Sequence, residues 1–209
     1  MVLVRGRPIL AHLEERLRAA GYTRILLVTG YRGEIIEEYF RGSRDISFVR
    51  QAEISGTGSA ALLAREFVGG DPFLLTYGDI LADAGCYRRI LAILEQDPAC
   101  DAVFAVKDVD DPYQGAAVYA NEGGRITRIV EKPPKGESTT RWNSAGIYAF
   151  RPSIFDELQQ VPLSPRGEYE LTSAVCQLLE KGRNVRLFPI EGAWRDIGRP
   201  EDVAALEVV

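Results

Sequence analysis

A glycine-bearing turn and a carboxylate stand out between Gln51 and Asp79. Gln51 precedes a Gly-Thr-Gly turn at 56–58 and a helical pattern, and Asp79 follows the apolar run 73–77. Glycine lets a ligand approach the backbone, and the start of a helix presents unpaired N–H groups, so such a turn can bind an anion or the edge of a base. A carboxylate at the end of a buried parallel strand lies where open α/β sheets bind their ligands. The stretch therefore predicts a nucleotide site.

The elements that must position this stretch alternate between strand and helix through the first half of the chain. The expected elements are a helix at 8–21, a strand at 24–29, a helix at 34–40, a strand at 46–50, a helix at 58–67, a strand at 73–77, a helix at 86–95 and a strand at 102–106. This alternation is typical of a parallel, doubly wound sheet with helices on both faces. The pattern predicts an α/β, Rossmann-like fold with a mostly parallel sheet.

Shorter strands follow residue 106. The runs 116–120 and 125–130 flank Asn-Glu-Gly-Gly, a sequence typical of a β-hairpin, so we expect a small antiparallel hairpin region. A polar loop at 162–167 is of the kind that can close over a substrate. The remaining expected elements are a strand at 143–150, helices at 153–158 and 169–181, a strand at 185–190 and a helix from 200 to the chain end.

Composition limits the classes of function. A chain of 209 residues with 46% hydrophobic content can bury a full core, so we expect one domain over residues 1–209. The net charge of −5 disfavours a nucleic-acid partner and favours small-molecule substrates, and a homo-oligomer stays open. No apolar run is long enough to span a membrane, and no signal peptide is apparent, which predicts a cytoplasmic protein. The three cysteines lack metal-ligand spacing and are expected as reduced thiols.

Four separated motifs resemble those of the sugar-1-phosphate nucleotidyltransferases. Their order and their spread over almost the whole chain argue against chance resemblance, although each motif alone is weak. The segment at 2–10 also resembles the one that follows the family's signature loop. The motifs are Gln51-x4-Gly56-Thr57, the strand that ends in Gly78-Asp79, Glu131-Lys132-Pro133 followed by Asn143-Ser144-Ala145-Gly146-Ile147-Tyr148, and Trp194-Arg195-Asp196-Ile197-Gly198.

The resemblance implies transfer of a nucleotidyl group from UTP or dTTP to a sugar 1-phosphate, with release of pyrophosphate. It implies that Asp79 and Asp196 hold a Mg²⁺ ion and that Lys132 acts at the sugar phosphate. Magnesium prefers hard oxygen ligands and keeps several waters, so two carboxylates and phosphate oxygens suffice. A strand-end or surface aspartate would explain either carboxylate without a metal. The attacking phosphate oxygen is already an anion at neutral pH, so the reaction needs no side-chain nucleophile.

The resemblance also assigns the binding residues. The amide of Gln51 offers a donor and an acceptor together, which suits uracil or thymine. Turn glycines, a solvated Glu131–Lys132 charge pair, or a bulge near Asn143 remain structural alternatives. The implied nucleotide-binding residues are Gln51, Gly56, Thr57 and Gly78, and the implied sugar-binding residues are Gly115, Glu131, Asn143 and Gly146.

The chain departs from the family at its amino terminus. Members carry a first strand, a Gly-x-Gly-Thr-Arg phosphate loop and a lysine ahead of the point where this chain begins. Because the first strand of a doubly wound sheet is central, its absence predicts two apolar strands with unpaired edges. Losing one preorganised donor can cost on the order of 10²-fold in rate, so we expect this chain alone to be weak or inactive.

Two explanations fit this departure. We favour a sequence that begins late, or a fragment of an active enzyme. The alternative is a shortened, inactive paralogue that binds sugar nucleotide or a partner subunit. A dinucleotide-dependent oxidoreductase is disfavoured, because the glycine turn has Ala61 where a third glycine would stand and lacks a suitable acidic ribose ligand.

Overall fold

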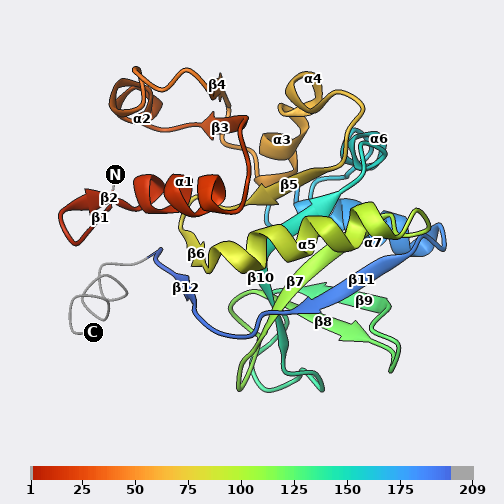
Figure 1. Ribbon diagram of the computed structural model, residues 1–209. Coiled ribbons are helices and arrows are strands. Elements are labelled where there is room, and N and C mark those ends of the chain that lie inside the picture. Colours follow the sequence, from red (N-terminus) through yellow and green to blue (C-terminus); the bar gives the residue numbers. More distant parts are fainter. Residues whose placement is uncertain (1, 199–209) are drawn as a thin grey trace.

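The structure is a computed structural model that describes residues 2–198 (Figure 1). The helices are α1 (Ile9–Ala19), α2 (Gly33–Tyr39), α3 (Thr57–Leu62), α4 (Arg65–Val68), α5 (Ala84–Gln96), α6 (Ile154–Leu158) and α7 (Leu171–Glu180). The strands are β1 (Leu3–Val4), β2 (Arg7–Pro8), β3 (Ile25–Thr29), β4 (Ile46–Arg50), β5 (Phe73–Thr76), β6 (Ile80–Ala82), β7 (Ala102–Asp108), β8 (Ala116–Ala120), β9 (Ile126–Glu131), β10 (Trp142–Phe150), β11 (Val185–Pro189) and β12 (Trp194–Asp196).

The main sheet confirms the α/β class, but it is mixed rather than mostly parallel. Its order is β11-β7-β10-β8-β9, with β5 also paired to β10. Strand β10 is antiparallel to β5, β7 and β8, whereas β11 and β7 run parallel. Because β10 returns from the β8–β9 hairpin to lie between β5 and β7, the two strands expected in one parallel sheet are not neighbours.

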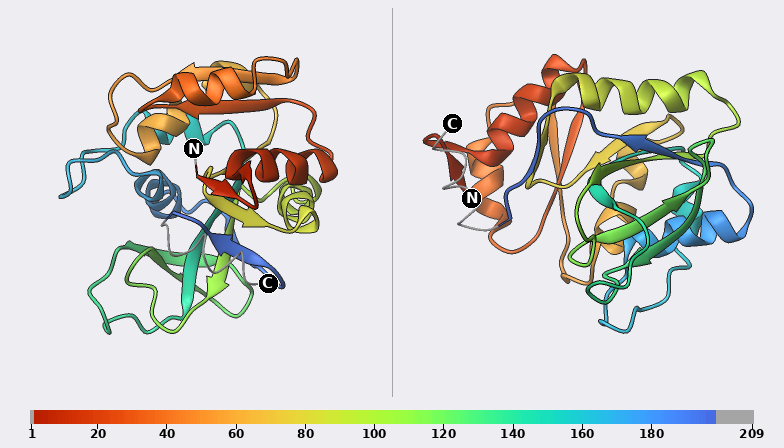
Figure 2. Two further views of the ribbon diagram at one scale, coloured as in Figure 1. Left: turned by 90° about the vertical axis from the view of Figure 1, so that its left-hand side faces the viewer. Right: turned by 90° about the horizontal axis from the view of Figure 1, so that it is seen from below.

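Helices cover both faces of this sheet, as predicted. Val103 and Ala105 of β7 pack in the cluster that contains α1 and α5, whereas Phe104 and Val106 pack in the cluster that contains α6 and α7. Figure 2 shows α5 and α7 on opposite sides of the sheet. Successive side chains of β7 point to opposite faces of the sheet, and each face packs against an apolar core. This explains why β7 is apolar at nearly every position.

The first parallel pair stands apart from the main sheet. Strands β3 and β4 pair in parallel, and within residues 2–198 β3 pairs only with β4 and β5 only with β10. A cavity of about 680 Å³ lies between β3 and β5, lined largely by apolar side chains. This gap is where the sequence predicts a missing central strand, and all four residues of β5 are only half-buried beside it.

Other differences from the predicted elements are local. The expected helix at 58–67 is two short helices, α3 and α4, and the pairing of β6 with β12 was not predicted. The helix expected from Pro200 lies outside the described residues. The three cysteines are free thiols, and within residues 2–198 no helix has the length and apolarity needed to cross a membrane.

Candidate active site

A cavity of about 950 Å³ opens where β10 changes partners. Along one edge β10 pairs with β8 at Asn143 and with β5 from Ile147 onward, and the register shifts between these points. Gly146 lies within the shift with φ +71°, and its carbonyl accepts a hydrogen bond from the Tyr77 N–H at 3.0 Å. Eight of the eleven predicted site residues line the cavity: Thr57, Asp79, Gly115, Glu131, Lys132, Asn143, Gly146 and Asp196.

The two predicted metal ligands converge. Strand β12 is antiparallel to β6 with Asp196 opposite Ile80, and the Ile197 N–H donates to the Asp79 carbonyl at 2.9 Å. A Cβ placed on Gly198 would lie 3.3 Å from Asp196 Oδ1 and 3.5 Å from Asp79 Oδ2. Glycine at 198 therefore leaves room where two carboxylates from distant parts of the sequence face each other.

Glu131 and Lys132 both line the cavity, although neighbouring strand residues normally point to opposite faces. Strand β9 ends at Glu131, and Lys132 has the left-handed φ of +43°. The Lys132 N–H donates to the Gly115 carbonyl at 2.7 Å. The end of the strand therefore removes the alternation and directs both side chains to one site.

The Glu131 carboxylate is only 27% exposed, and burial raises its pKa above the ordinary value. Thr172 donates a hydrogen bond to Glu131 Oε2 at 2.9 Å, and this hydrogen bond lowers the pKa. Nearby Glu170 raises the pKa, whereas Arg166 and Lys132 lower it. The carboxylate is thus held by one hydroxyl in a site of mixed charge.

Asn143 and Gly115 form one contact. A Cβ on Gly115 would collide with the Asn143 amide, so glycine permits this close approach. The Asn143 Nδ2 donates to the Ser144 carbonyl at 2.9 Å, whereas Oδ1 is buried and has no hydrogen-bond partner within residues 2–198. The Asn143 side chain is thus packed against the Gly115 backbone at the cavity wall.

Three predicted residues do not line this cavity. The Gln51 Nε2 donates to the Gly56 carbonyl at 3.1 Å and to Ser59 Oγ at 2.9 Å, so this amide group braces the turn. Gly56 has φ +119°, and a Cβ there would collide with the Tyr169 backbone. Gly78 borders the cavity between β3 and β5 instead. The structure thus gives Gly56 a packing reason for being glycine, and the ligand roles of these three residues stay predictions.

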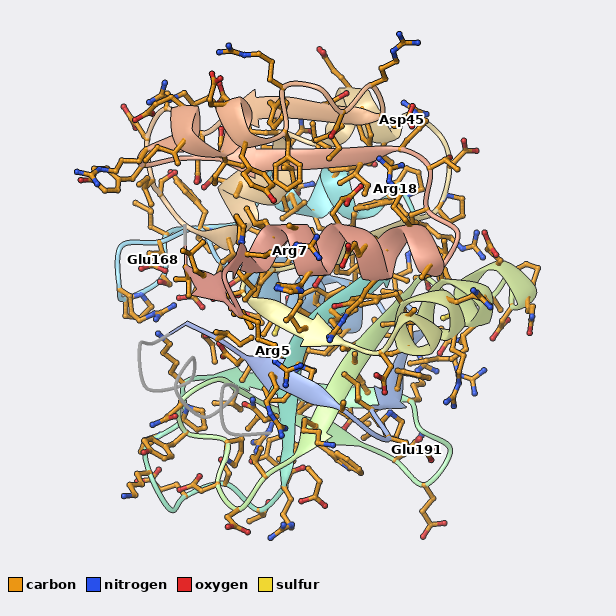
Figure 3. All side chains as sticks on the ribbon, turned by 60° about the vertical axis from the view of Figure 1, so that its left-hand side comes forward. Arg5, Arg7, Arg18, Asp45, Glu168 and Glu191 are labelled. Atoms are coloured by element: carbon orange, nitrogen blue, oxygen red, sulfur yellow. The ribbon has the colours of Figure 1, made fainter. Side chains whose placement is uncertain are left out.

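Sequence reasoning missed the residues that the loop before α7 brings to the site. Arg166 lines the cavity, and its Nε donates to Glu170 Oε1 at 3.1 Å. Its Nη2 lies 3.3 Å from Glu168 Oε2 and 3.9 Å from Glu131 Oε1. Figure 3 labels Glu168 on this loop. The run Arg-Gly-Glu-Tyr-Glu at 166–170 was the available signal, because it begins inside the loop at 162–167 that was already expected near substrate and continues it with two carboxylates.

Among residues 2–198, the cavity lining has an excess of negative charge. These residues contribute the carboxylates of Asp79, Asp108, Asp111, Glu131, Glu168, Glu170 and Asp196 and the cations of Lys107, Lys132, Arg166 and Arg195. Seven carboxylates and four cations cannot by themselves favour a polyanion, because like charges repel. A phosphate-bearing ligand here therefore needs further positive charge, and the facing carboxylates of Asp79 and Asp196 are a suitable place for a divalent cation.

The sequence matches the nucleotidyl transferase family over residues 1–207. The UTP–glucose-1-phosphate uridylyltransferase AglF of Haloferax volcanii is 34% identical, and the match covers 97% of this chain and 83% of AglF. The low-salt glycan biosynthesis nucleotidyltransferase Agl11 of the same organism is 33% identical, and the bifunctional protein GlmU of Methanococcus maripaludis is 34% identical. The chain spans about half the length of these last two relatives, 57% and 47%.

Solved structures share the fold. A UDP-glucose pyrophosphorylase complexed with UDP-glucose superimposes with a TM-score of 0.86 at 20% identity, covering all of this chain and 88% of the other. A UTP-bound UGPase from Acinetobacter baumannii gives a TM-score of 0.80 at 24% identity, covering all of this chain and 84% of the other. These structures extend the α/β assignment to the whole described chain.

Proposed function

Because the chain belongs to the nucleotidyl transferase family, we propose that its cavity serves nucleotidyl transfer from UTP or dTTP to a sugar 1-phosphate. The products would be a nucleotide sugar and pyrophosphate, in nucleotide-sugar biosynthesis. The observation that carries the proposal is the meeting of Asp79 and Asp196 in the same cavity as Glu131, Lys132 and Asn143. A cavity of about 950 Å³ lies in the roughly 300–1,000 Å³ range of small-molecule sites.

The donor set fits Mg²⁺. Asp79 and Asp196 would hold the ion through hard carboxylate oxygens, one from each residue lying close to Gly198, and phosphate oxygens and water would supply its other ligands. When bound, the ion would neutralise charge on the reacting phosphates and fix their orientation. Such an ion would also offset the excess of carboxylates in the cavity.

The sugar end of the cavity is assigned to the β8–β10 side. Glu131 can accept hydrogen bonds from sugar hydroxyls, because its second oxygen is already fixed by Thr172. Asn143 lines the same part of the cavity and is assigned to the sugar as well. Lys132 and Arg166 are the cations best placed to orient the sugar phosphate, since both line the cavity beside Glu131.

The proposed chemistry is an in-line attack by a phosphate oxygen of the sugar 1-phosphate on the α-phosphate of the triphosphate. The bond to pyrophosphate breaks as the new P–O bond forms, so no covalent enzyme intermediate is required. Lys132 and Arg166 would hold the attacking phosphate and screen its repulsion from the triphosphate, and Asp79 and Asp196 would hold the metal. The protein's contribution is positioning and charge neutralisation.

The nucleotide end is assigned to the start of α3. Thr57 lines the cavity and its Oγ1 accepts a hydrogen bond from the Leu171 N–H at 3.1 Å, which fixes its position. We assign base recognition to Gln51 and the backbone at Gly56 and Gly78, with the Gln51 amide also bracing the turn.

A second candidate is a protein that binds sugar nucleotide or a partner subunit with little turnover. The open cavity between β3 and β5 favours this candidate, because Asp79 lies at its border and a site beside an incomplete sheet is less rigidly held. We accordingly expect slow turnover from the chain as it stands.

The test measures Mg²⁺-dependent pyrophosphate release from UTP or dTTP with glucose 1-phosphate, together with Mg²⁺-dependent nucleotide binding by calorimetry. Asp79→Asn or Asp196→Asn should lower the rate by on the order of 10²-fold, as expected when a preorganised transition-state contact is lost. Binding reports on the site even if turnover is slow. Asp71→Asn, at an exposed position ahead of β5, is the matched control and should change neither.

Equal loss in the control, or metal-dependent binding that survives in both site variants, would show that these carboxylates do not hold the metal. Nucleotide binding without pyrophosphate release would support the second candidate. Absence of any nucleotide binding would reject the transfer activity and a sugar-nucleotide-binding role, and would leave binding of a partner subunit as the remaining form of the second candidate.

A further inference from the structure

Arg166 lies among three carboxylates that differ in burial. Its Nε donates a hydrogen bond to Glu170 Oε1 at 3.1 Å, and its Nη2 donates to Glu168 Oε2 at 3.3 Å. The Nη2 atom also lies 3.9 Å from Glu131 Oε1. The Glu170 side chain is only 7% exposed, whereas that of Glu168 is 46% exposed. The two ends of the guanidinium group are therefore held in different surroundings.

Glu170 pairs with Arg166 although its position in the chain suggests another role. It is the N-cap residue of α7, yet its side chain forms no capping hydrogen bond. The carboxylate turns back instead to Arg166, four residues earlier. A buried carboxylate is unfavourable unless it is paired, so separating this pair would leave Glu170 with an uncompensated charge. Glu170 thus holds the Nε end of Arg166 firmly.

The backbone around Glu170 is itself anchored. Tyr169 and Leu171, on either side of it, form three hydrogen bonds to the turn at 55–58, with lengths of 2.7, 2.8 and 3.1 Å. These bonds tie the start of α7 to the turn before α3. A carboxylate on such a segment is a fixed point against which the Arg166 side chain can be oriented.

The backbone of Arg166 is bonded mainly within its own turn. Its N–H donates to Ser164 Oγ at 3.2 Å, and the Ser164 N–H donates to the Glu168 carbonyl at 2.9 Å. Gly167, with φ +75°, lets the chain reverse between them. Because these bonds lie inside the turn, the place of the guanidinium group depends on its side-chain contacts.

Glu168 competes with a phosphate for the other end of Arg166. It lies on the loop before α7 (Figure 3), and water screens an exposed ion pair of this kind, so the pair contributes little. A phosphate group binds a guanidinium through charge-assisted hydrogen bonds and can take the place of Glu168. Since Nη2 also lies beside Glu131, which is assigned to the sugar, the Nη end is the one next to the sugar end of the cavity.

We propose that Glu170 is a positioning residue for the sugar phosphate, which holds the Nε end of Arg166 so that the Nη end can bind the phosphate, and that Glu168 is the counterion displaced by that phosphate. Because this role takes a sugar 1-phosphate as the ligand of Arg166, it rests on the proposed function. Glu170 acts through Arg166 alone. The step is one of binding, and no covalent bond forms or breaks.

The test compares Glu170→Met with Glu168→Met. Methionine has the length of glutamate but neither its charge nor its strong acceptor. Each variant removes one negative charge at the cavity, so on charge alone both should bind a phosphate more tightly. If Glu170 positions Arg166, the two variants should instead differ in sign.

Glu170→Met should weaken the binding of glucose 1-phosphate by about tenfold, as expected when a hydrogen bond between charged groups is lost. Glu168→Met should tighten it by about twofold to threefold, as expected when an exposed competing ion pair is removed. Calorimetry on the purified chain with Mg²⁺ and UTP present measures both. Glu180→Met, at an exposed position at the end of α7, is the control and should bind as the original chain does.

Two further variants separate positioning from other roles of Glu170. In a chain that already carries Arg166→Gln, Glu170→Met should cause no further weakening, because there is no guanidinium left to orient. Glu170→Gln keeps an uncharged acceptor and should bind with an affinity between those of the original chain and Glu170→Met. In the pyrophosphate-release assay, the KM for glucose 1-phosphate should rise in Glu170→Met while the KM for UTP stays unchanged, a split that general loosening of the fold would not give.

Nuclear magnetic resonance tests the geometry without any ligand. The Nε–H signal of Arg166, identified by its loss in Arg166→Gln, should persist in Glu168→Met and shift or broaden in Glu170→Met, because only the second variant removes its acceptor. Circular dichroism checks that each variant folds.

Unchanged or tighter binding of glucose 1-phosphate by Glu170→Met would overturn the proposal. So would an equal loss in the Arg166→Gln background, since Glu170 would then contact the sugar itself, or an Arg166 signal that is the same in Glu170→Met. If the original chain binds UTP but no glucose 1-phosphate, this role and the proposed transfer both fail. If it binds glucose 1-phosphate and the two glutamate variants behave alike, this role alone fails.

Discussion

Two halves of this α/β unit have similar apolar sequences but very different surroundings. In the half built on β7 and β10, residues 102–106 and 145–150 are buried, with Gly146 at the bulge. In the half built on β3 and β5, only Ile25 and Thr29 of β3 are buried and every residue of β5 is half-buried. An apolar run therefore specifies a strand, but its burial depends on neighbours that come from elsewhere in the sequence.

The candidate active site lies on the boundary between these halves. Glu131, Lys132 and Asn143 belong to the half built on β7 and β10, called the closed half below. Thr57 and Asp79 also border the cavity between β3 and β5, called the slot below, which lies in the open half. The residues proposed to contact the nucleotide and the metal are therefore the ones that also border the less buried half.

Hydrogen exchange should separate the two halves most strongly. Global unfolding of a domain costs about 5–15 kcal/mol, whereas local opening of an exposed strand edge has a free energy close to zero. Each 1.4 kcal/mol of opening free energy slows exchange by about tenfold. We therefore expect amides of β10 to exchange at least about 10³-fold more slowly than slot-facing amides of β3. Mass spectrometry on peptic fragments measures both in one sample. Equal protection of the two strands would mean that the slot is closed in solution.

A pair of phenylalanines that face each other in the sheet gives the next largest effect. Phe150 of β10 is fully buried, and its register partner Phe73 of β5 borders the slot. Phe150→Ala should cost about 3–5 kcal/mol of unfolding free energy, whereas Phe73→Ala should cost about 1–2 kcal/mol, because Phe73 already loses part of its burial to the slot. Urea denaturation measures both. A larger cost for Phe73→Ala would contradict the comparison.

Local pattern was enough to predict most elements of the closed half. The hairpin at 116–131, strand β10 and helix α7 all follow from residues close in sequence. Pairing was not predictable, because the insertion of β10 between β5 and β7 depends on contacts between residues that are 34 positions apart at Trp142 and Asp108 and 77 apart at Phe150 and Phe73. The mixed sheet is therefore a tertiary result.

The candidate site shows the same limit. Asp79 was recognisable as a strand-end carboxylate, but its meeting with Asp196 depends on β12 pairing with β6, a three-residue strand with no sequence signal of its own. Arg166 was hidden because it reaches the cavity from a loop, where neither periodicity nor spacing indicates direction. Gly56 has a packing reason for being glycine in its contact with Tyr169, which the sequence could not show, and its role toward a ligand stays a prediction.

The smallest effect concerns the pH dependence of stability in the closed half. The pKa of Glu131 is raised mainly by burial, so the folded state holds its proton to a higher pH than the unfolded chain does. Stability from this group is present below the ordinary pKa of about 4.3 and decreases as the pH rises through the folded-state pKa. Glu131→Gln should therefore gain stability relative to the original chain between pH 4 and pH 7.

Glu137→Gln, at an exposed loop position, is the control and should show no such trend. Parallel urea titrations at several pH values measure the difference, and a Glu131→Gln variant that loses stability as the pH rises would show that Thr172 and Arg166 outweigh burial at this carboxylate.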